Sequence, residues 1–177
     1  WLLFIALTVT LAYQIRMVLP YTRLWKKEVQ TAKDDAKLAE QQIKIMVSNV
    51  LTPNDKTQDL VDLVNDKNPD ILITLETDKK WQQALSQIEP DYPYTVKIPL
   101  DNLYGMHLYS KLELIDPEVK YLIIDDLPSI HTQLRLQGGR VIWLYCLHPM
   151  PPSPTEADKS TTRDAELLMV GKHIKDN

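Results

Sequence analysis

Cysteine and glycine are scarce in this chain, and their scarcity excludes several kinds of site. Cys146 is the single cysteine among 177 residues, so no disulfide can form within the chain. Only four glycines are present, and the segment beginning at Gly105 has too few for a phosphate-binding loop, so Gly105 is expected to serve backbone geometry. His131, Cys146 and His148 lack the closely spaced ligand pairs of structural zinc modules, which argues against a zinc site.

Acidic residues are absent from residues 1–27, which carry four basic side chains and a net charge of +4. Because the whole chain has a net charge of −4, residues 28–177 carry −8. An acidic main part argues against loose, charge-driven binding to a nucleic-acid backbone. A local basic groove is still compatible with this charge.

Residues 1–19 are mostly apolar. The four polar interruptions are Thr8, Thr10, Gln14 and Arg16. As a helix this stretch would be about 28 Å long, close to the thickness of a bilayer core. We therefore predict a transmembrane helix over residues 1–22, with the lipid bilayer as its partner. The alternative is a buried helix of a soluble protein.

The basic residues Arg23, Lys26 and Lys27 come after the apolar run, whereas a signal peptide carries its basic residues before it. A basic cluster directly after a span favours a cytoplasmic position for the rest of the chain. Residues 23–42 are largely polar and contain neither glycine nor proline. They are expected to form a polar juxtamembrane linker.

Two apolar runs, residues 43–49 and 70–76, each end in a polar residue that can bind a hard cation. Residues 57–68 between them have a helical pattern, so we expect a β-α-β unit. Parallel strands joined by a right-handed crossover have their carboxyl ends at the same edge of the sheet. Asn49 and Glu76 are therefore expected to converge there, where their oxygens suit Mg²⁺. The alternative is that both side chains cap turns of a buried sheet.

The rest of the chain alternates between strand and helix patterns, which is typical of an α/β sandwich. A helix is expected over residues 78–88 and a final helix over residues 161–174, with a hairpin turn at residues 137–140. The expected strands are residues 94–98, 106–110, 119–124, 130–136 and 141–147.

His148 stands where the run 141–147 meets a proline-rich loop, which repeats the placement of Asn49 and Glu76. We expect that run to be a central strand and the three polar residues to share one sheet edge. A histidine there suits contact with a phosphate oxygen, and the alternative is a loop histidine bonded to the backbone. Arg163 opens the last helix, where an arginine either holds a phosphate through two hydrogen bonds or forms a surface ion pair.

Five motifs follow one another along the chain: Val47–Asn49, Pro69–Glu76, Gly105–Lys111, Leu147-His148 and Arg163–Leu167. In this order they resemble the endonuclease/exonuclease/phosphatase superfamily, which has the DNase-I-like fold. The similarity covers nearly the whole chain and is greatest to bacterial membrane-anchored members. It implies a four-layer α/β sandwich in an integral protein of the bacterial inner membrane.

The resemblance also implies roles for four residues. Glu76 corresponds to the family's Mg²⁺-binding glutamate, with Mn²⁺ as an alternative ion, and Asn49 to the asparagine at the metal and phosphate site. His148 corresponds to the histidine that contacts the scissile phosphate, and Arg163 to an arginine that opens the following helix. The implied reaction is hydrolysis of a phosphodiester or phosphomonoester. Lipid, small-molecule and nucleic-acid substrates all stay open, with a slight preference for the first two.

Two segments that the family needs, Gly-Asp-x-Asn and Ser-Asp-His, do not occur in the chain. Residues 43–177 are therefore expected to be the N-terminal part of such a domain, without its second sheet, inactive alone and with apolar sheet surface exposed. The favoured function is a membrane-tethered, Mg²⁺-dependent phosphoesterase that is active in the complete protein. The alternative is a non-catalytic, membrane-anchored binding or assembly module on the same scaffold.

Overall fold

The computed structural model describes residues 1–27, 42–151 and 160–176. The chain divides into two compact units, Trp1–Ala36 and Lys37–Asn177, and each is described by itself. Most of the linker predicted over residues 23–42 lies outside the described residues.

The first unit is built on one apolar helix, α1 (Leu2–Val18), which continues into the 3-10 helix η1 (Leu19–Tyr21). No side chain of α1 is buried. The hydroxyls of Thr8 and Thr10 each donate to a carbonyl oxygen one turn earlier, at 2.9 Å, so the helix satisfies these polar groups itself. Residues 2–21 are long and apolar enough to cross a membrane. The helix is therefore either a membrane anchor or a signal sequence.

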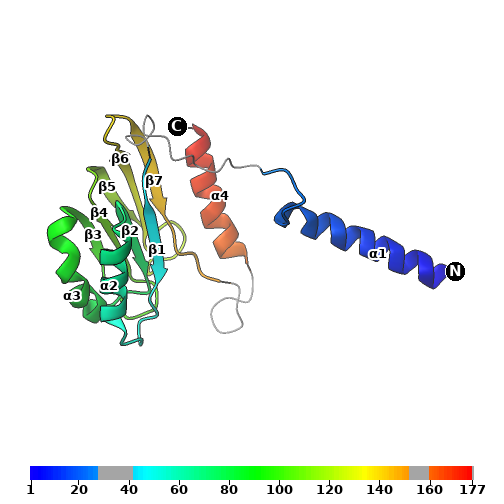
Figure 1. Cartoon of the computed structure of the whole chain (residues 1–177), viewed down its shortest axis with the longest axis horizontal. Coiled ribbons are helices and arrows are strands. Elements are labelled where there is room, and N and C mark those ends of the chain that lie inside the picture. Colours follow the sequence, from blue (N-terminus) through cyan, green and yellow to red (C-terminus); the bar gives the residue numbers. More distant parts are fainter. Residues whose placement is uncertain (28–41, 152–159, 177) are drawn as a thin grey trace. The chain divides into compact units, whose positions relative to one another are not determined.

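The second unit begins with a four-stranded sheet (Figure 1). Its strands in spatial order are β1 (Ile45–Asn49), β2 (Ile71–Leu75), β4 (Met106–Ser110) and β3 (Tyr94–Ile98). β1 and β2 run parallel and are joined through α2 (Thr57–Lys67), whereas β4 runs antiparallel to both of its neighbours. The predicted β-α-β unit is confirmed. Its helix ends at Lys67 and is followed by Asn68, which adopts a left-handed conformation just before Pro69.

Helices cover one face of this sheet. α3 (Lys79–Leu85) begins after Asp78, whose Oδ1 accepts a hydrogen bond from the Trp81 N–H at 2.9 Å, and it continues into the 3-10 helix η3 (Ser86–Asp91). This capping bond satisfies an N–H group that has no partner within the helix. The most buried residues between helices and sheet are Val64, Leu72, Trp81, Leu85 and Tyr109. The helix predicted over residues 78–88 is confirmed, with a tighter final part.

A second sheet is formed by the antiparallel strands β5 (Leu114–Lys120), β6 (Ser129–Arg135) and β7 (Val141–Cys146), in that order. Ile130, Leu134 and Cys146 from its inner face pack in one apolar core with Ile73 and Leu108 of the first sheet. The two sheets therefore face each other. The expectation that the second sheet would be missing is wrong.

Two strand predictions for the second sheet need correction. β5 starts five residues earlier than the strand expected at 119–124, because Pro117 and a register shift between Ile115 and Glu118 interrupt its pattern. A proline inside a strand is tolerated at such an irregularity but hides the alternation. β7 lies at the end of the sheet order rather than at its centre, among the strands that the structure describes.

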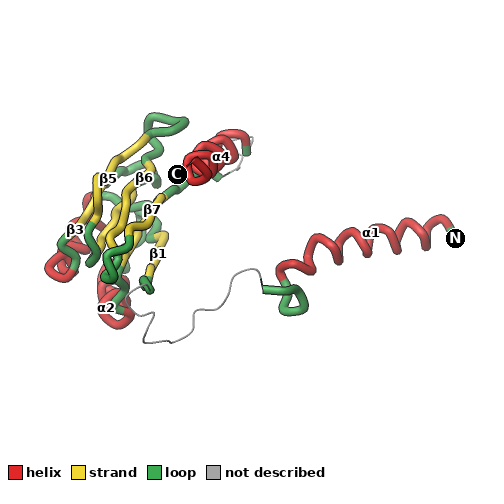
Figure 2. The backbone as a smooth tube through the Cα atoms, turned by 90° about the horizontal axis from the view of Figure 1, so that it is seen from above, coloured by secondary structure: helices red, strands yellow, loops and turns green. Residues whose placement is uncertain are grey.

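The last helix, α4 (Thr161–Asp176), packs on the outer face of the second sheet (Figure 2). The Tyr145 hydroxyl lies 2.8 Å from His173 Nδ1, and the Trp143 ring meets the His173 ring edge-on with centroids 5.6 Å apart. The layers of the second unit therefore run helices, sheet, sheet, helix. This is an α/β architecture, as predicted.

Burial controls the charge of His107, which β4 places under the helices with no exposed surface. Loss of solvent, with a smaller effect from Lys97, lowers its pKa to about 4. A histidine in the unfolded chain has a pKa of about 6.5. Between these values the unfolded state binds more protons than the folded state, so the folded state becomes less stable as pH falls.

We expect His107 alone to lower the free energy of unfolding by about 2 kcal/mol between about pH 7 and about pH 5. Urea denaturation at both values, on the chain and on a His107→Gln variant, measures this contribution. His131, whose pKa burial also lowers, acts in the same direction in both proteins and cancels in the comparison. Equal pH dependence of the two proteins would contradict the prediction.

Candidate functional site

Glu76 lies in a bulge at the end of β2. The pairing of β2 with β4 is regular up to Leu75, which pairs with Met106. The carbonyl of the next residue on the β4 side, Gly105, accepts a hydrogen bond from the Thr77 N–H at 3.1 Å rather than from Glu76. Glu76 is thus the extra residue, and its φ is +61°. Bulges redirect side chains and are common beside active sites.

The bulge reverses the direction of the Glu76 side chain. Because alternate residues of a strand face the same side, an uninterrupted β2 would place Glu76 with Leu72 on the face that the helices cover. Instead, Glu76 Oε1 accepts a hydrogen bond from Asn49 Nδ2 at 2.5 Å. Met46 of β1 packs toward the helices, so Asn49, three residues later, faces the second sheet. The carboxylate is therefore turned toward the end of the space between the sheets.

The loop after β1 fixes this pair of side chains. Asn49 Oδ1 accepts from the Leu51 N–H at 3.1 Å, which turns the amide nitrogen toward Glu76. Thr52 Oγ1 donates to the Glu76 carbonyl oxygen at 2.7 Å. Leu51, like Glu76, has a positive φ, and such strained non-glycine residues gather at functional sites. Asn49 therefore orients the carboxylate, and its own coordination of a metal stays a prediction.

His148 reaches the same place from the second sheet. Its Nε2 lies 3.9 Å from Glu76 Oε1, and the two side chains are 19% and 16% exposed. The His148 ring packs at a tilt on the buried Tyr104 ring, with centroids 5.4 Å apart. The prediction that one sheet edge carries all three residues is wrong in its topology, because His148 follows β7. The structure nevertheless brings Asn49, Glu76 and His148 together, at the same end of two facing sheets.

Arg163 has a different partner in the structure. Its Nε and Nη2 both donate to Oδ1 of the adjacent Asp164, at 3.0 and 2.9 Å. Hydrogen bonds from Ser160 and Arg163 lower the pKa of that carboxyl. Among the described residues, Arg163 is thus held in a half-exposed ion pair rather than against Glu76. Its contact with phosphate stays a prediction.

Metal ligands of the zinc type do not come together. His131 pairs with Tyr145 and so faces the outer side of the second sheet, whereas Cys146 faces the core between the sheets. Burial raises the pKa of the Cys146 thiol to about 12, which keeps it protonated. Residues 1–27, 42–151 and 160–176 contain no group of three His, Cys, Asp or Glu side chains suited to a metal.

A hard cation such as Mg²⁺ needs fewer protein ligands than a structural zinc ion. Mg²⁺ keeps several water ligands and is often bound by one or two carboxylates. Within the described ranges no lysine or arginine pairs with the Glu76 carboxylate, whose neighbours are an amide and an imidazole. The residues present therefore fit a site with Glu76 as its anionic ligand.

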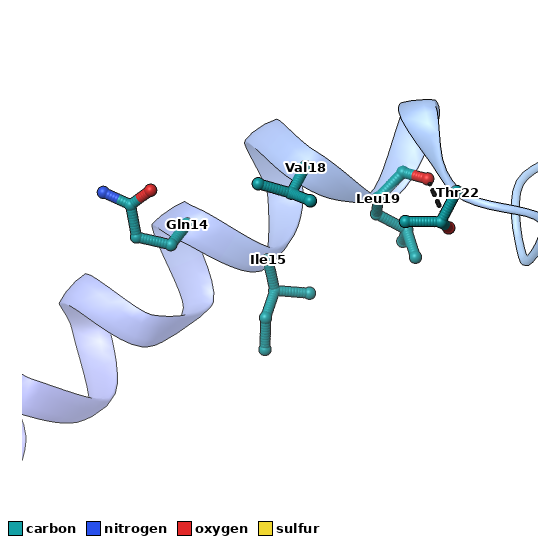
Figure 3. A pocket seen from close by; sticks show the side chains of 5 residues that line it. All are labelled: Gln14, Ile15, Val18, Leu19 and Thr22. Carbon is teal, nitrogen blue, oxygen red and sulfur yellow. Dashed lines mark hydrogen bonds between the residues drawn. The ribbon is translucent and has the colours of Figure 1, made fainter.

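A hollow lies along α1 in the first unit (Figure 3). It is lined by Gln14, Ile15, Val18, Leu19 and Thr22. The Thr22 hydroxyl donates to the Leu19 carbonyl at 2.8 Å. No carboxylate, histidine or cysteine lines it, so it offers no group for acid–base or metal chemistry. The candidate site is therefore the Asn49–Glu76–His148 cluster.

Sequence reasoning missed two residues that build this cluster, Thr52 and Tyr104. Thr52 stands in a loop without periodic pattern, and its role depends on a hydrogen bond to a residue 24 positions away. Tyr104 directly precedes the motif that begins at Gly105, so its position was a usable signal. The expected backbone role of Gly105 is confirmed, since a Cβ atom there would lie 1.8 Å from the Thr77 carbonyl oxygen.

Solved structures share this fold. The structure of D. rerio TDP2 with a single-strand DNA product superposes with a TM-score of 0.63 at 15% identity, covering 75% of this chain and 54% of that one. Truncated C. elegans TDP2 gives 0.62 at 13% identity, covering 76% and 55%. An endonuclease/exonuclease/phosphatase from Bacteroides vulgatus gives 0.60 at 15% identity, covering 76% and 60%.

At these identities the similarity shows the fold alone, and the chain spans between 54% and 60% of the length of these structures. No curated protein sequence matches the chain. The family model described as "Endonuclease/Exonuclease/phosphatase family" matches residues 46–177, a range that includes all three clustered side chains. The chain therefore belongs to the endonuclease/exonuclease/phosphatase family.

Proposed function

We propose that this chain is part of a membrane-tethered, Mg²⁺-dependent phosphoesterase. The observation that carries the proposal is the convergence of Asn49, Glu76 and His148, with the carboxylate held at 2.5 Å by the asparagine and an imidazole nitrogen 3.9 Å away. Family membership supports it, because members of this family are hydrolases of phosphoester bonds.

Each residue of the cluster has its own part in the reaction. Glu76 would hold the metal ion, which when bound supplies positive charge against the phosphoryl group. Asn49 keeps the carboxylate in position, and His148 donates a hydrogen bond to a phosphoryl oxygen as negative charge develops there. Water attacks phosphorus, the ester P–O bond breaks, and the leaving oxygen takes a proton. Arg163 would have to exchange Asp164 for the phosphate to contribute.

The group that deprotonates the water is not among these residues. We place it in a further part of the domain, which would carry the Gly-Asp-x-Asn and Ser-Asp-His segments. The placement rests on the absence of these two segments from this sequence.

The apolar helix α1 and the net charge of residues 28–177 both favour some substrates over others. If α1 anchors the protein in a bacterial inner membrane, lipid phosphoesters lie within easy reach of the domain. The acidic charge of residues 28–177 disfavours long nucleic-acid ligands. A lipid or small phosphoester is therefore the preferred substrate, although the D. rerio TDP2 structure holds single-strand DNA.

Metal removal tests the proposal. We expect the full-length protein to hydrolyse at least one member of a panel of lipid, small-molecule and single-strand DNA phosphoesters. Chelation with EDTA is expected to lower the rate about 100-fold or more, because a metal ion supplies several kcal/mol to such reactions. Excess Mg²⁺ or Mn²⁺ should restore it. Hydrolysis that is insensitive to EDTA would rule out the metal.

The competing function is a non-catalytic membrane-anchored module. The absence of the Gly-Asp-x-Asn and Ser-Asp-His segments from this sequence favours it. This function predicts that folded full-length protein hydrolyses nothing in the panel, with or without metal. The same experiment therefore separates the two functions.

A further inference from the structure

Four buried polar atoms behind the Glu76 bulge lack a hydrogen-bond partner in the part of the chain that the structure describes. They are Thr74 Oγ1, Thr77 Oγ1, Trp81 Nε1 and His107 Nε2. None of their residues is more than 1% exposed. Buried polar groups are almost always paired, so four in one region need an explanation.

The strand pairing brings three of them together. Thr74 and His107 are directly opposite each other in β2 and β4, which places their Cβ atoms about 5 Å apart. Thr77 is opposite Gly105. Gly105 comes two residues before His107, so both positions face the same side of the sheet, and Thr77 faces that side with them. That side also carries Tyr109, which packs against the helices. All three side chains therefore lie on the helix-covered face.

The first turn of α3 covers the same spot. Trp81 packs in one cluster with Leu72 and Tyr109, the neighbours of Thr74 and His107 on that face of the sheet. Asp78, the residue that caps α3, acts on His107 by raising its pKa against the larger effect of burial. The Trp81 side chain thus belongs to the same buried cluster, and its indole nitrogen has no partner among the described residues.

The tautomer of His107 decides what these atoms can bind. The Tyr109 hydroxyl lies 3.3 Å from His107 Nδ1. A phenol can donate a hydrogen bond or accept one, and in one of the two arrangements Tyr109 donates to Nδ1. In a neutral imidazole Nε2 then carries the other hydrogen. In this arrangement His107 Nε2 and Trp81 Nε1 are therefore donors, and the two threonine hydroxyls can accept.

We propose that these two donors and two acceptors bind one buried water molecule, and that His107 is thereby a positioning residue for Glu76. A water accepts two hydrogen bonds and donates two, and buried waters occur where several unpaired polar groups meet. The water ties Thr77, the second residue of the bulge, to β4. The backbone turn that directs the Glu76 carboxylate is held in this way. The water site stands on the buried atoms, whereas the positioning role rests on the proposed function.

NMR tests the water site without any metal. A long-range ¹H–¹⁵N correlation on the full chain at about neutral pH should show His107 in the Nε2–H form. The Nε2 proton should give a cross-peak to a long-lived water, and the signals are assigned by their loss in His107→Gln. An Nδ1–H form, or an Nε2 proton without a water contact, would overturn the water site.

Mn²⁺ binding tests the positioning role. Thr74→Val and Thr77→Val remove a hydroxyl at nearly constant volume and are expected to weaken Mn²⁺ binding about tenfold, as measured by electron paramagnetic resonance. Thr132→Val is the matched control, because Thr132 is also buried but bonds to Ile115 in the second sheet. Its Mn²⁺ affinity should match that of the wild type.

The outcomes are distinguishable. Unchanged Mn²⁺ affinity in both Thr74→Val and Thr77→Val, beside a wild type that binds the ion, overturns the positioning role and leaves the proposed function standing. A folded wild type that binds no Mn²⁺ overturns the proposed function and the positioning role with it. In that case the NMR result still decides the water site.

Discussion

Replacing Glu76 by glutamine is expected to lower phosphoester hydrolysis by the full-length protein about 1,000-fold and to leave the fold unchanged. The fold should persist because glutamine keeps Oε1, the atom that accepts the hydrogen bond from Asn49. The negative charge is lost, and with it the anionic ligand that the proposed metal site depends on. Several kcal/mol of charge stabilisation correspond to a loss of this size.

The kinetics of this variant distinguish metal binding from general damage. Rates measured against Mg²⁺ concentration should show a much weaker apparent affinity in Glu76→Gln, with an unchanged urea midpoint. Glu118→Gln is the control, because Glu118 lies on the second sheet in an exposed ion pair with Lys120, and such pairs contribute little. Its rate should stay within about threefold of the wild type. Equal rates for both variants would show that Glu76 does not bind the catalytic metal.

The β-α-β unit could be predicted from the sequence because its signals are local. Residues 45–49 and 71–75 are apolar runs of strand length, and Asn68-Pro69 ends the helix between them. The right-handed crossover then places both strand ends at one edge without knowledge of the rest of the fold. The proximity of Asn49 and Glu76 follows from this rule, and their 2.5 Å hydrogen bond bears it out.

The direction of the Glu76 side chain could not be predicted. Strand alternation alone would have placed it with Leu72 under the helices, and only the positive φ of the bulge reverses it. That φ depends on contacts with Gly105 and Thr52, which lie 29 and 24 positions away along the chain. A long-range contact of this kind leaves no periodic signal in the residues around Glu76.

The sheet that contains β7, the strand before His148, could not be predicted from the local sequence either. The run 141–147 predicts a strand, and β7 confirms it, but alternation does not say which strands are its neighbours. Pairing with β6 puts β7 in the second sheet, so His148 approaches Glu76 from across the sandwich. Asn49, Glu76 and His148 lie together as predicted, the single sheet edge was wrong, and the roles of these residues stay a prediction.

A side chain added at Gly105 should strongly destabilise the backbone around the site. A Cβ atom there would lie 1.8 Å from the Thr77 carbonyl oxygen and 2.7 Å from the Leu100 backbone nitrogen. Both neighbours are backbone atoms joined by their own hydrogen bond of 3.1 Å, so neither can move aside alone. Gly105→Ala is expected to lower the free energy of unfolding by about 3 kcal/mol, the upper end for an overpacked core.

The same substitution should also damage the site, because Thr77 is the residue that follows Glu76 in the bulge. A shift of its backbone turns the carboxylate away from Asn49, so Mn²⁺ affinity should fall together with stability. Gly171→Ala is the matched control: a Cβ atom at this position in α4 meets nothing within 4 Å, and alanine favours a helix by up to about 1 kcal/mol. Urea denaturation of the two variants should therefore give changes of opposite sign. A Gly105→Ala protein as stable as Gly171→Ala would mean that the bulge does not need the close approach of Gly105 to hold Glu76.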